Sequence, residues 1–300
     1  MSNLLWGIDL GGTKIEGVAI NTFPSLQIIQ RMRVPTEADQ GYDHILSQIK
    51  LLIDQIREKT GSNPTHLGIG TPGIVDKETH LIKNSNTLGL IGRPMKEDLE
   101  SLLGIEVRMA NDANCFAIAE ANLGAVPDIV KNPEVVFGVI MGTGVGGGIV
   151  VNGKVIHGKH GIGGEWGHNI LDDSGDACYC GKKGCVETFI SGPACERYYS
   201  KISGVKLPMA EIYKLYLIDD PKAKETMDRL VHYFGKALAI IINIIDPEVI
   251  VFGGGLGNLD VLYKEGKEEV RKYIFNYELK THFIKPKLGD SAGVIGAALL

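Results

Sequence analysis

Two stretches of the chain repeat the same alternation of short apolar segments and glycine turns. Residues 6–20 read WGIDLGGTKIEGVAI, residues 137–151 read FGVIMGTGVGGGIVV, and the two stretches align without a gap. On both sides of each glycine turn the apolar residues form short runs that lack helical periodicity. Each stretch therefore predicts a strand, a tight turn and a second strand, and together they indicate an internally duplicated chain.

Longer amphipathic patterns predict helices between such strands. Residues 42–58 carry apolar side chains at helical intervals, namely Ile45, Ile49, Ile53 and Ile56. A long helix is predicted from about Lys222 to Ile245, ending before Asp246 and Pro247 because the residue before a proline leaves the α region. The C-terminal residues 289–300, GDSAGVIGAALL, predict a glycine turn that opens another helix. Strands mixed with helices in this way are typical of an α/β fold.

The composition fits a globular chain with two domains of ordinary size. Of 300 residues, 44% are hydrophobic and 22% are charged, and the net charge is -5 at pH 7. This acidic balance argues against binding to nucleic acid or anionic lipid. The N-terminus shows no basic segment followed by a long apolar stretch, and the longest apolar run, Leu238–Ile245, is too short to span a bilayer. The sequence therefore predicts a cytoplasmic protein without a membrane or nucleic-acid partner.

Three of the five cysteines fall within eight positions of a glycine-rich segment. With an upstream histidine they give the spacing H-x9-C-x-C-x4-C. One imidazole and three thiolates form the ligand set of a closed, tetrahedral structural zinc site, whereas a catalytic zinc keeps one position open for water. Three unrelated cysteines in a glycine-rich loop are the alternative interpretation. The predicted zinc ligands are His168, Cys178, Cys180 and Cys185, and Cys115 and Cys195 are expected to be ordinary buried residues.

The second glycine turn also matches the G-x-G-x-x-G pattern of dinucleotide-binding folds, at Gly142, Gly144 and Gly147. That pattern needs a helix directly after the glycines, but here an apolar strand leads into Asn152 and Gly153, which is a hairpin signal. Glycine turns in hairpins aim backbone N–H groups toward an anion. Two such hairpins facing each other across a cleft describe a nucleotide clamp of the actin-like, sugar-kinase type. Taken singly, an ordinary β-turn is the alternative for each.

A carboxylate follows the strand predicted around residues 107–109 and begins the next helix. In the segment MANDANCFAIAEANLGA, Asp112 lies at or near the helix N-cap, a position that by itself accounts for an aspartate. Asn111 and Asn114 are alternative caps. If the glycine hairpins hold phosphates, phosphoryl transfer still needs a group that orients and accepts the proton of the attacking hydroxyl. Asp112 is the best-placed carboxylate for that role.

Two further carboxylates, Glu165 and Glu187, flank the predicted zinc ligands. Carboxylates are rarely buried without partners, so these two and His168 are the wrong set for a packed core. They are a suitable set for recognising adjacent hydroxyls of a small sugar. His168 has two distinct ring nitrogens and can place one on zinc and the other on the substrate. A surface position is the alternative for Glu165.

Seven motifs occur in the order found in the ROK family of sugar kinases and repressors, which the chain resembles over essentially its whole length. They are DLGGTK (9–14), GTPG (70–73), NDAN (111–114), GTGVGGG (142–148), GEWGH (164–168), CYCGKKGCVE (178–187) and FGGGLGN (252–258). The resemblance implies an actin-like ATPase fold of the ribonuclease H-like type, with two lobes and a cleft for nucleotide and sugar between them. The expected lobes are residues 1–113 and 114–289. The second lobe would carry the zinc knot (residues 168–185), and a C-terminal helix of about 290–300 would pack back on the first.

The resemblance also implies roles for individual residues. Asp112 would be the catalytic base, and Asp9 would help to position Mg²⁺ through water. Sugar contacts carry over to Gly73, Asn86, Asn111, Asp112, Glu165, His168 and Glu187. ATP contacts carry over to Asp9, Gly11, Gly12, Thr13, Lys14, Gly142, Thr143, Gly144, Gly253, Gly254 and Gly255. The implied cofactors are ATP with Mg²⁺ and a structural Zn²⁺.

Within the family, the segments KNSN, GEWGHN, CYCGKKGCVETFISG and GDSAGVIGAA are most similar to the bacterial fructokinase and mannokinase branch. The N-acetylglucosamine kinase branch more often has phenylalanine at the position of Trp166. The expected reaction is ATP-dependent phosphorylation of a hexose at its 6-hydroxyl, with fructose or mannose first and N-acetylglucosamine or glucose as alternatives. A sugar-sensing regulator is the alternative of another class, although a phosphate strand that starts at Leu5 leaves no residues for a DNA-binding domain. Because family members are often dimers, a homodimer is expected.

Overall fold

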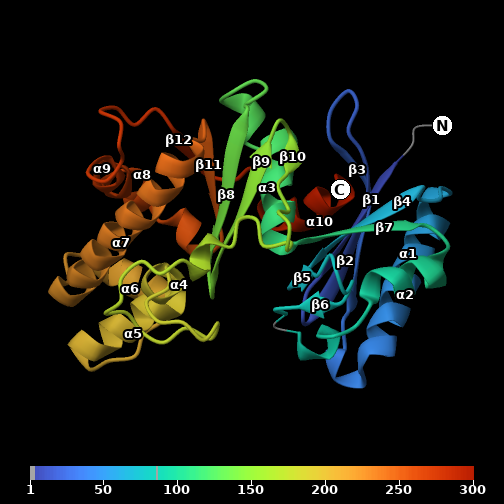
Figure 1. The fold of residues 1–300 in the computed structure, drawn as a ribbon, viewed down its shortest axis with the longest axis horizontal. Helices are drawn as coiled ribbons and strands as arrows, with labels where there is room; N and C mark the ends of the chain where they lie inside the picture. Colours follow the sequence, from blue (N-terminus) through green and yellow to red (C-terminus); the bar gives the residue numbers. More distant parts are fainter. Residues whose placement is uncertain (1–3, 86) are drawn as a thin grey trace. The chain divides into compact units, whose positions relative to one another are not determined.

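The computed structural model describes residues 4–85 and 87–300 and divides them into two compact units (Figure 1). The first unit comprises the described residues up to Asp128, together with Gly153–Gly163 and Lys287–Leu300. The second unit comprises Ile129–Asn152 and Gly164–Pro286. The lobe boundary expected at residue 113 falls inside helix α3 (Asp112–Asn122), which belongs to the first unit.

The first unit is built on a five-stranded sheet with the order β3-β2-β1-β4-β7. Strands β1, β2 and β3 are antiparallel neighbours, and β4 and β7 run parallel to β1. The predicted N-terminal glycine hairpin is therefore confirmed as β1 and β2. The strands are β1 (Leu5–Leu10), β2 (Lys14–Asn21), β3 (Gln27–Pro35), β4 (His66–Thr71) and β7 (Glu106–Asn111).

Strand β1 has two faces with different partners because its side chains alternate. Trp6, Ile8 and Leu10 are fully buried in the apolar core shared with α1 (Tyr42–Thr60) and α2 (Met95–Leu103). The opposite face carries Gly7 and Asp9 and meets α10 (Ala292–Ala298), because a Cβ atom on Gly7 would lie 2.3 Å from a carbonyl oxygen of that helix. Figure 1 shows α1 and α2 on one side of this sheet and α3 and α10 on the other.

The amphipathic pattern of residues 42–58 correctly predicts α1, whose buried residues include all four isoleucines at helical spacing. The helix ends at Gly61, which takes the left-handed conformation and donates its N–H to the Arg57 carbonyl. Short elements complete the unit: β5 (Ile74–Val75), β6 (Ile82–Lys83), β10 (Lys154–Val155), and the 3₁₀ turns Ala38–Gln40, Leu88–Leu90, Val126–Asp128 and Gly289–Ser291.

The second unit is built on a sheet in which β9, β8, β11 and β12 are successive neighbours. β8 and β9 form the second predicted glycine hairpin, and β11 runs parallel to β8. Phe137 of β8, Phe252 of β11 and Phe234 of α7 are buried together in its core. The strands are β8 (Val135–Met141), β9 (Val145–Val151), β11 (Val249–Gly253) and β12 (His282–Ile284).

Helix α7 (Pro221–Ile245) matches the long helix predicted from the sequence. Asp220 caps its N-terminus by accepting the N–H groups of Lys222 and Ala223, at 3.0 and 2.8 Å. Among the described residues no helix is both long and apolar enough to cross a membrane. The other helices are α4 (Glu187–Ile190), α5 (Gly192–Ser203), α6 (Met209–Tyr216), α8 (Asp260–Tyr263) and α9 (Glu265–Arg271), and the 3₁₀ turns are Trp166–His168 and Gly255–Asn258.

Candidate active site

The buried residue Thr36 fixes the turn between β1 and β2 through hydrogen bonds to its carbonyl groups. The Gly11 N–H donates to the Lys14 carbonyl at 3.0 Å and closes the turn. The Thr36 hydroxyl donates to the Gly11 carbonyl at 2.7 Å, and the Thr36 N–H donates to the Thr13 carbonyl at 3.0 Å. Because Thr36 satisfies these carbonyls, the turn is held in one conformation while Gly12, Thr13 and Lys14 stay exposed. The sequence analysis missed Thr36, since nothing in its local pattern marks it as a support for a distant turn.

The turn between β8 and β9 is anchored by residues that follow the zinc knot. The Gly142 N–H donates to the Gly144 carbonyl at 2.9 Å, and the Gly192 N–H of α5 donates to the Gly142 carbonyl at 2.9 Å. The Val145 N–H donates to Glu187 Oε2 at 2.9 Å. Glu187, a predicted sugar contact, therefore also holds the predicted phosphate turn in place.

Gly253 ends strand β11, and Gly254 and Gly255 follow it next to the same turn. Gly254 has a positive φ of 78°, and a Cβ atom there would lie 2.3 Å from the Met141 carbonyl oxygen. Only glycine fits such a close approach. The chain thus brings two of the three predicted ATP-binding glycine segments together within the second unit.

Asp9 is a carboxylate in a crowded, negatively charged environment. Its neighbour across the strand pair is Glu16, and a Cβ atom on Gly293 of α10 would lie 3.0 Å from Asp9 Oδ2. Burial, followed by the charges of Asp112 and Glu16, raises the pKa of Asp9 to about 6, although Lys14 acts in the opposite direction. Asp9 and Asp112 therefore lie close enough to interact electrostatically. A pair of carboxylates in such a place suits a hard divalent cation.

Helix α3 begins at Asp112, but its N-cap is Asn111. The Asn111 side-chain oxygen accepts the Asn114 N–H at 2.8 Å, which satisfies one of the unpaired donors of the first turn. Asp112 Oδ1 accepts the adjacent Ala113 N–H at 2.8 Å, which is not a capping bond to the second or third residue of the helix. Asn111, and not Asp112, is therefore the N-cap of α3, so helix capping does not explain the aspartate at position 112.

The electrostatics of Asp112 suit a proton acceptor. The residue is open to solvent, yet the protein around its carboxyl removes enough hydration to raise its pKa above the ordinary value for aspartate. Backbone N–H groups, including that of Ala113, act in the opposite direction. A carboxylate with a raised pKa that remains accessible is a stronger base than an ordinary aspartate.

The four predicted zinc ligands converge in the second unit. All their ligand atoms lie within 4.8 Å of one another. His168 Nδ1 is 3.5 Å from Cys178 Sγ, and Cys180 Sγ is 3.6 Å from Cys185 Sγ. In a tetrahedral site with zinc–sulfur bonds of about 2.3 Å, ligand atoms lie roughly 3.8 Å apart, so these distances fit a closed zinc site. A zinc ion held by these four ligands would fix the loop on both sides of Tyr179, through Cys178 and Cys180. It would leave no position open for water.

The distal nitrogen of His168 has a protein partner that the sequence analysis missed. Tyr179, between two of the cysteines, places its hydroxyl 3.0 Å from His168 Nε2, and the two rings meet edge to face. Burial and the charges of Glu187 and Glu165 raise the pKa of Tyr179 to about 12. The aromatic residue inside the C-x-C motif is the signal that could have drawn attention to it.

Trp166, the residue that separates the two kinase branches in the sequence analysis, has a structural role here. Its indole is 3% exposed, and its Nε1–H donates to the Gly146 carbonyl of β9 at 2.9 Å. This bond ties the GEWGH segment, which carries Glu165 and His168, to the second glycine hairpin. The identity of this aromatic residue is therefore explained by packing, and it gives little information about the sugar.

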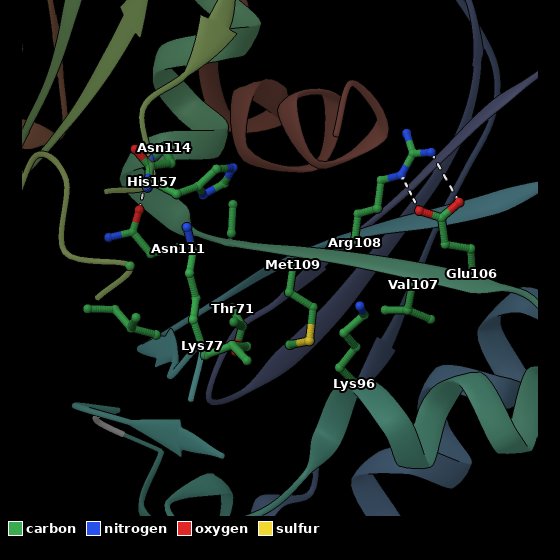
Figure 2. A pocket seen from close by; sticks show the side chains of 14 residues that line it. Thr71, Lys77, Lys96, Glu106, Val107, Arg108, Met109, Asn111, Asn114 and His157 are labelled. Carbon is green, nitrogen blue, oxygen red and sulfur yellow. Dashed lines mark hydrogen bonds and ion pairs between the residues drawn. The ribbon is translucent and has the colours of Figure 1, made fainter. Parts of the chain in front are cut away.

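The remaining predicted sugar contacts lie in the first unit. Gly73 has a φ of 99°, and a Cβ atom there would lie 2.8 Å from the Lys83 carbonyl oxygen, so the position requires glycine. Asn86 lies outside the described residues. Asn111 ends β7 and lines a cavity of about 240 Å³, shown in Figure 2, that runs along this strand from the ion pair of Arg108 and Glu106. Asp112 is not part of the cavity lining.

Comparisons with known proteins agree with this arrangement. The ROK family profile matches residues 5–300. A protein named N-acetyl-D-glucosamine kinase from Vibrio atlanticus is 36% identical, with 99% of each chain covered. The solved ROK hexokinase of Thermus thermophilus superposes with a TM-score of 0.89 at 32% identity, covering 99% of this chain and 97% of that one. A Streptomyces griseus ROK glucokinase, solved with glucose and AMPPNP, gives 0.77 at 25% identity, covering 98% of each. These matches confirm the predicted actin-like fold.

Proposed function

The chain belongs to the ROK family, and from this premise we propose that it is an ATP-dependent kinase that transfers the γ-phosphoryl group to a hexose, at the 6-hydroxyl. The observation that carries the proposal is the state of Asp112. It is accessible, its pKa is raised, and Asn111 relieves it of the capping role at the start of α3.

In the proposed reaction Asp112 accepts the proton of the attacking sugar hydroxyl. The exposed turn of Gly12, Thr13 and Lys14 and the turn at Gly142–Gly144 would bind the phosphates through backbone N–H groups. Asp9 would hold Mg²⁺ through water, and the ion would supply positive charge that stabilises the transferring group.

Glu165, His168, Glu187, Gly73 and Asn111 are proposed to bind the sugar hydroxyls. A structural zinc bound by the four ligands would fix His168 and the loop that leads to Glu187. The carboxylate of Glu187 also supports the phosphate turn through Val145. Sugar binding and phosphate binding would then share one rigid element, which suits a reaction in which positioning dominates.

We place N-acetyl-D-glucosamine first among the acceptors, because curated relatives that match 99% of the chain carry the name N-acetyl-D-glucosamine kinase. Fructose and mannose are the second choice, and they rest on the motif resemblance described above. Trp166 no longer argues for fructose or mannose over the acetylated sugar, because its hydrogen bond to the Gly146 carbonyl explains its identity.

The test is ADP release from Mg·ATP with fructose, mannose, glucose, N-acetylglucosamine and N-acetylmannosamine. We expect sugar-dependent turnover with at least one of the five, reduced about 10²- to 10⁴-fold in Asp112→Asn. Asp39→Asn is the matched control, because Asp39 is an exposed aspartate of the same unit. Unchanged turnover in Asp112→Asn would refute the assignment of the base. Sugar binding without turnover in the parent protein would favour a sugar-sensing regulator.

A further inference from the structure

Arg229 of α7 is a half-buried cation that the fold surrounds with aromatic rings. Its guanidinium carbon lies 4.6 Å from the ring centre of Tyr198, 5.0 Å from that of Tyr233 and 5.1 Å from that of Phe189. Two of these rings, Phe189 and Tyr233, also contact each other, with centroids 4.1 Å apart. Because the face of an aromatic ring attracts a cation, the three rings together stabilise this charge without needing an ion pair.

The same guanidinium also binds the backbone of the short helix α4. Arg229 Nη1–H donates to the Phe189 carbonyl at 3.3 Å. This carbonyl belongs to the last turn of α4, where carbonyl groups have no partner within the helix. The Phe189 ring is 2% exposed, and a Cβ atom on Gly175 would lie 2.5 Å from it, so the ring has little room to move. Arg229 therefore fixes both the backbone and the ring of a residue that lies two positions after Glu187.

Helix α4 in turn supports the glycine turn between β8 and β9. Its first residue, Glu187, accepts the Val145 N–H at 2.9 Å. The approach is close, because a Cβ atom on Gly144 would lie 2.7 Å from Glu187 Oε2. A small shift of α4 would therefore break the bond to Val145 or push the carboxylate into the turn. None of the contacts described for Arg229 reaches the turn itself, so an effect of Arg229 on the turn has to pass through α4.

We propose that Arg229 is a positioning residue, which holds α4 so that the Glu187 carboxylate stays on the Val145 N–H and the glycine turn keeps its shape. This inference rests on the proposed function, because only phosphate binding by that turn gives the contact a kinetic consequence. Arginine suits the role, since its planar guanidinium lies on aromatic faces while its N–H groups remain free to bond a carbonyl. A residue that only packed α7 would affect the stability of the second unit and leave the turn unchanged.

The experiment compares Arg229→Met with the parent protein by amide hydrogen exchange and by the kinetics of phosphoryl transfer. We expect exchange at Val145, measured relative to Ile250 of the same sheet, to accelerate about 3- to 10-fold, the effect of weakening one hydrogen bond. The value of kcat/KM for Mg·ATP should fall about 10- to 100-fold, because the phosphate turn is misplaced. Lys236→Met is the control, because Lys236 Nζ also lies over the Tyr233 ring, 5.7 Å from its centre, and has no described contact with α4. Arg229→Lys keeps the stem and the charge, so it should fold even if Arg229→Met does not, and it should change both quantities in the same direction by less.

A double-variant cycle tests whether Arg229 acts through Glu187. Glu187→Ala removes the acceptor of the Val145 N–H, so adding Arg229→Met to it should accelerate exchange at Val145 no further. Exchange at Val145 in Arg229→Met equal to that in the Lys236→Met control would overturn the inference, and so would fully additive effects in the double variant. If the parent protein phosphorylates none of the five sugars, the proposed function itself fails, whereas exchange at Val145 still decides whether Arg229 holds Glu187 in place.

Discussion

Glu120 offers the sharpest test of how the first unit is held together. Its side chain in α3 is fully buried and has no cationic partner among the described residues. Instead it accepts three backbone N–H groups, from Ala125 at 2.8 Å, from Leu288 at 2.8 Å and from Lys287 at 3.0 and 3.1 Å. The last two residues begin the segment that returns to the first unit and leads into α10.

The substitution Glu120→Gln keeps the shape of the side chain and removes part of its acceptor capacity. The amide oxygen can still accept from one side, whereas the amide nitrogen faces an N–H donor that it cannot satisfy. A buried donor left unpaired costs about 1–3 kcal/mol, and hydrogen bonds to a charged acceptor are roughly twice as strong as neutral ones. We therefore expect the free energy of unfolding to fall by about 3 kcal/mol.

The two tryptophans allow each unit to be followed separately, since Trp6 lies in the first and Trp166 in the second. In a Trp166→Phe background, urea unfolding monitored by Trp6 fluorescence should report the loss, and amide exchange at Leu288 should accelerate. Glu58→Gln, an exposed glutamate on α1, is the control and should change the free energy by less than about 0.5 kcal/mol. A Glu120→Gln value no larger than this control would refute the reasoning.

Three further predictions concern charge and metal. Because the pKa of Asp112 is raised and the base must be ionised, kcat/KM should fall as the pH is lowered through a value above that of an ordinary aspartate. A profile whose acid limb lies at or below the ordinary aspartate pKa of about 3.9 would contradict this. The folded-state pKa of Asp9, about 6, lies above its unfolded value, so the folded protein holds the extra proton and stability should fall as the pH rises from about 4 to 6. Asp9→Asn should consequently stabilise the metal-free protein at pH 7 by about 1–3 kcal/mol in urea unfolding. Metal analysis should find zinc in the purified protein, and chelation or Cys185→Ser should lower the unfolding temperature reported by Trp166.

Much of the fold could be predicted because its signals are local. The two glycine hairpins, α1 and α7 each follow from a periodicity within about 25 residues, and the structure places all of them as expected. The division into units is harder to predict, because the first unit includes residues 153–163 and 287–300. The chain re-enters the first unit because of contacts between distant segments, such as those of Glu120 with Lys287 and Leu288. A local sequence pattern does not predict such contacts.

The candidate site likewise contains residues that a local sequence pattern predicts and residues that only distant contacts reveal. The convergence of the four predicted zinc ligands could be expected from spacing alone, because one histidine and three cysteines within 18 positions match the ligand set of a closed zinc site. Their ligand atoms lie within 4.8 Å of one another, and the zinc itself stays a prediction. Asp112 could be placed at the start of a helix, but whether it or Asn111 caps that helix depends on side-chain rotamers that a sequence does not specify. Thr36 and Tyr179 act through bonds to residues 25 and 11 positions away, and only the structure reveals them.

The contrast between two neighbouring carboxylates of the first sheet gives a physical reason for placing Asp9 in a reaction site. Glu16 is 2% exposed and is paired with both Arg31 and Arg33, so its charge is compensated within the fold. Asp9, directly across the strand pair, has only Lys14 acting in its favour among the described residues, and Asp112 acts against it. The fold pairs Glu16 with two guanidinium groups but gives Asp9 none, so the charged form of Asp9 lowers the stability of the fold. Such a cost is expected where a charge serves binding or catalysis rather than folding, and a cation that arrives with the nucleotide would offset it.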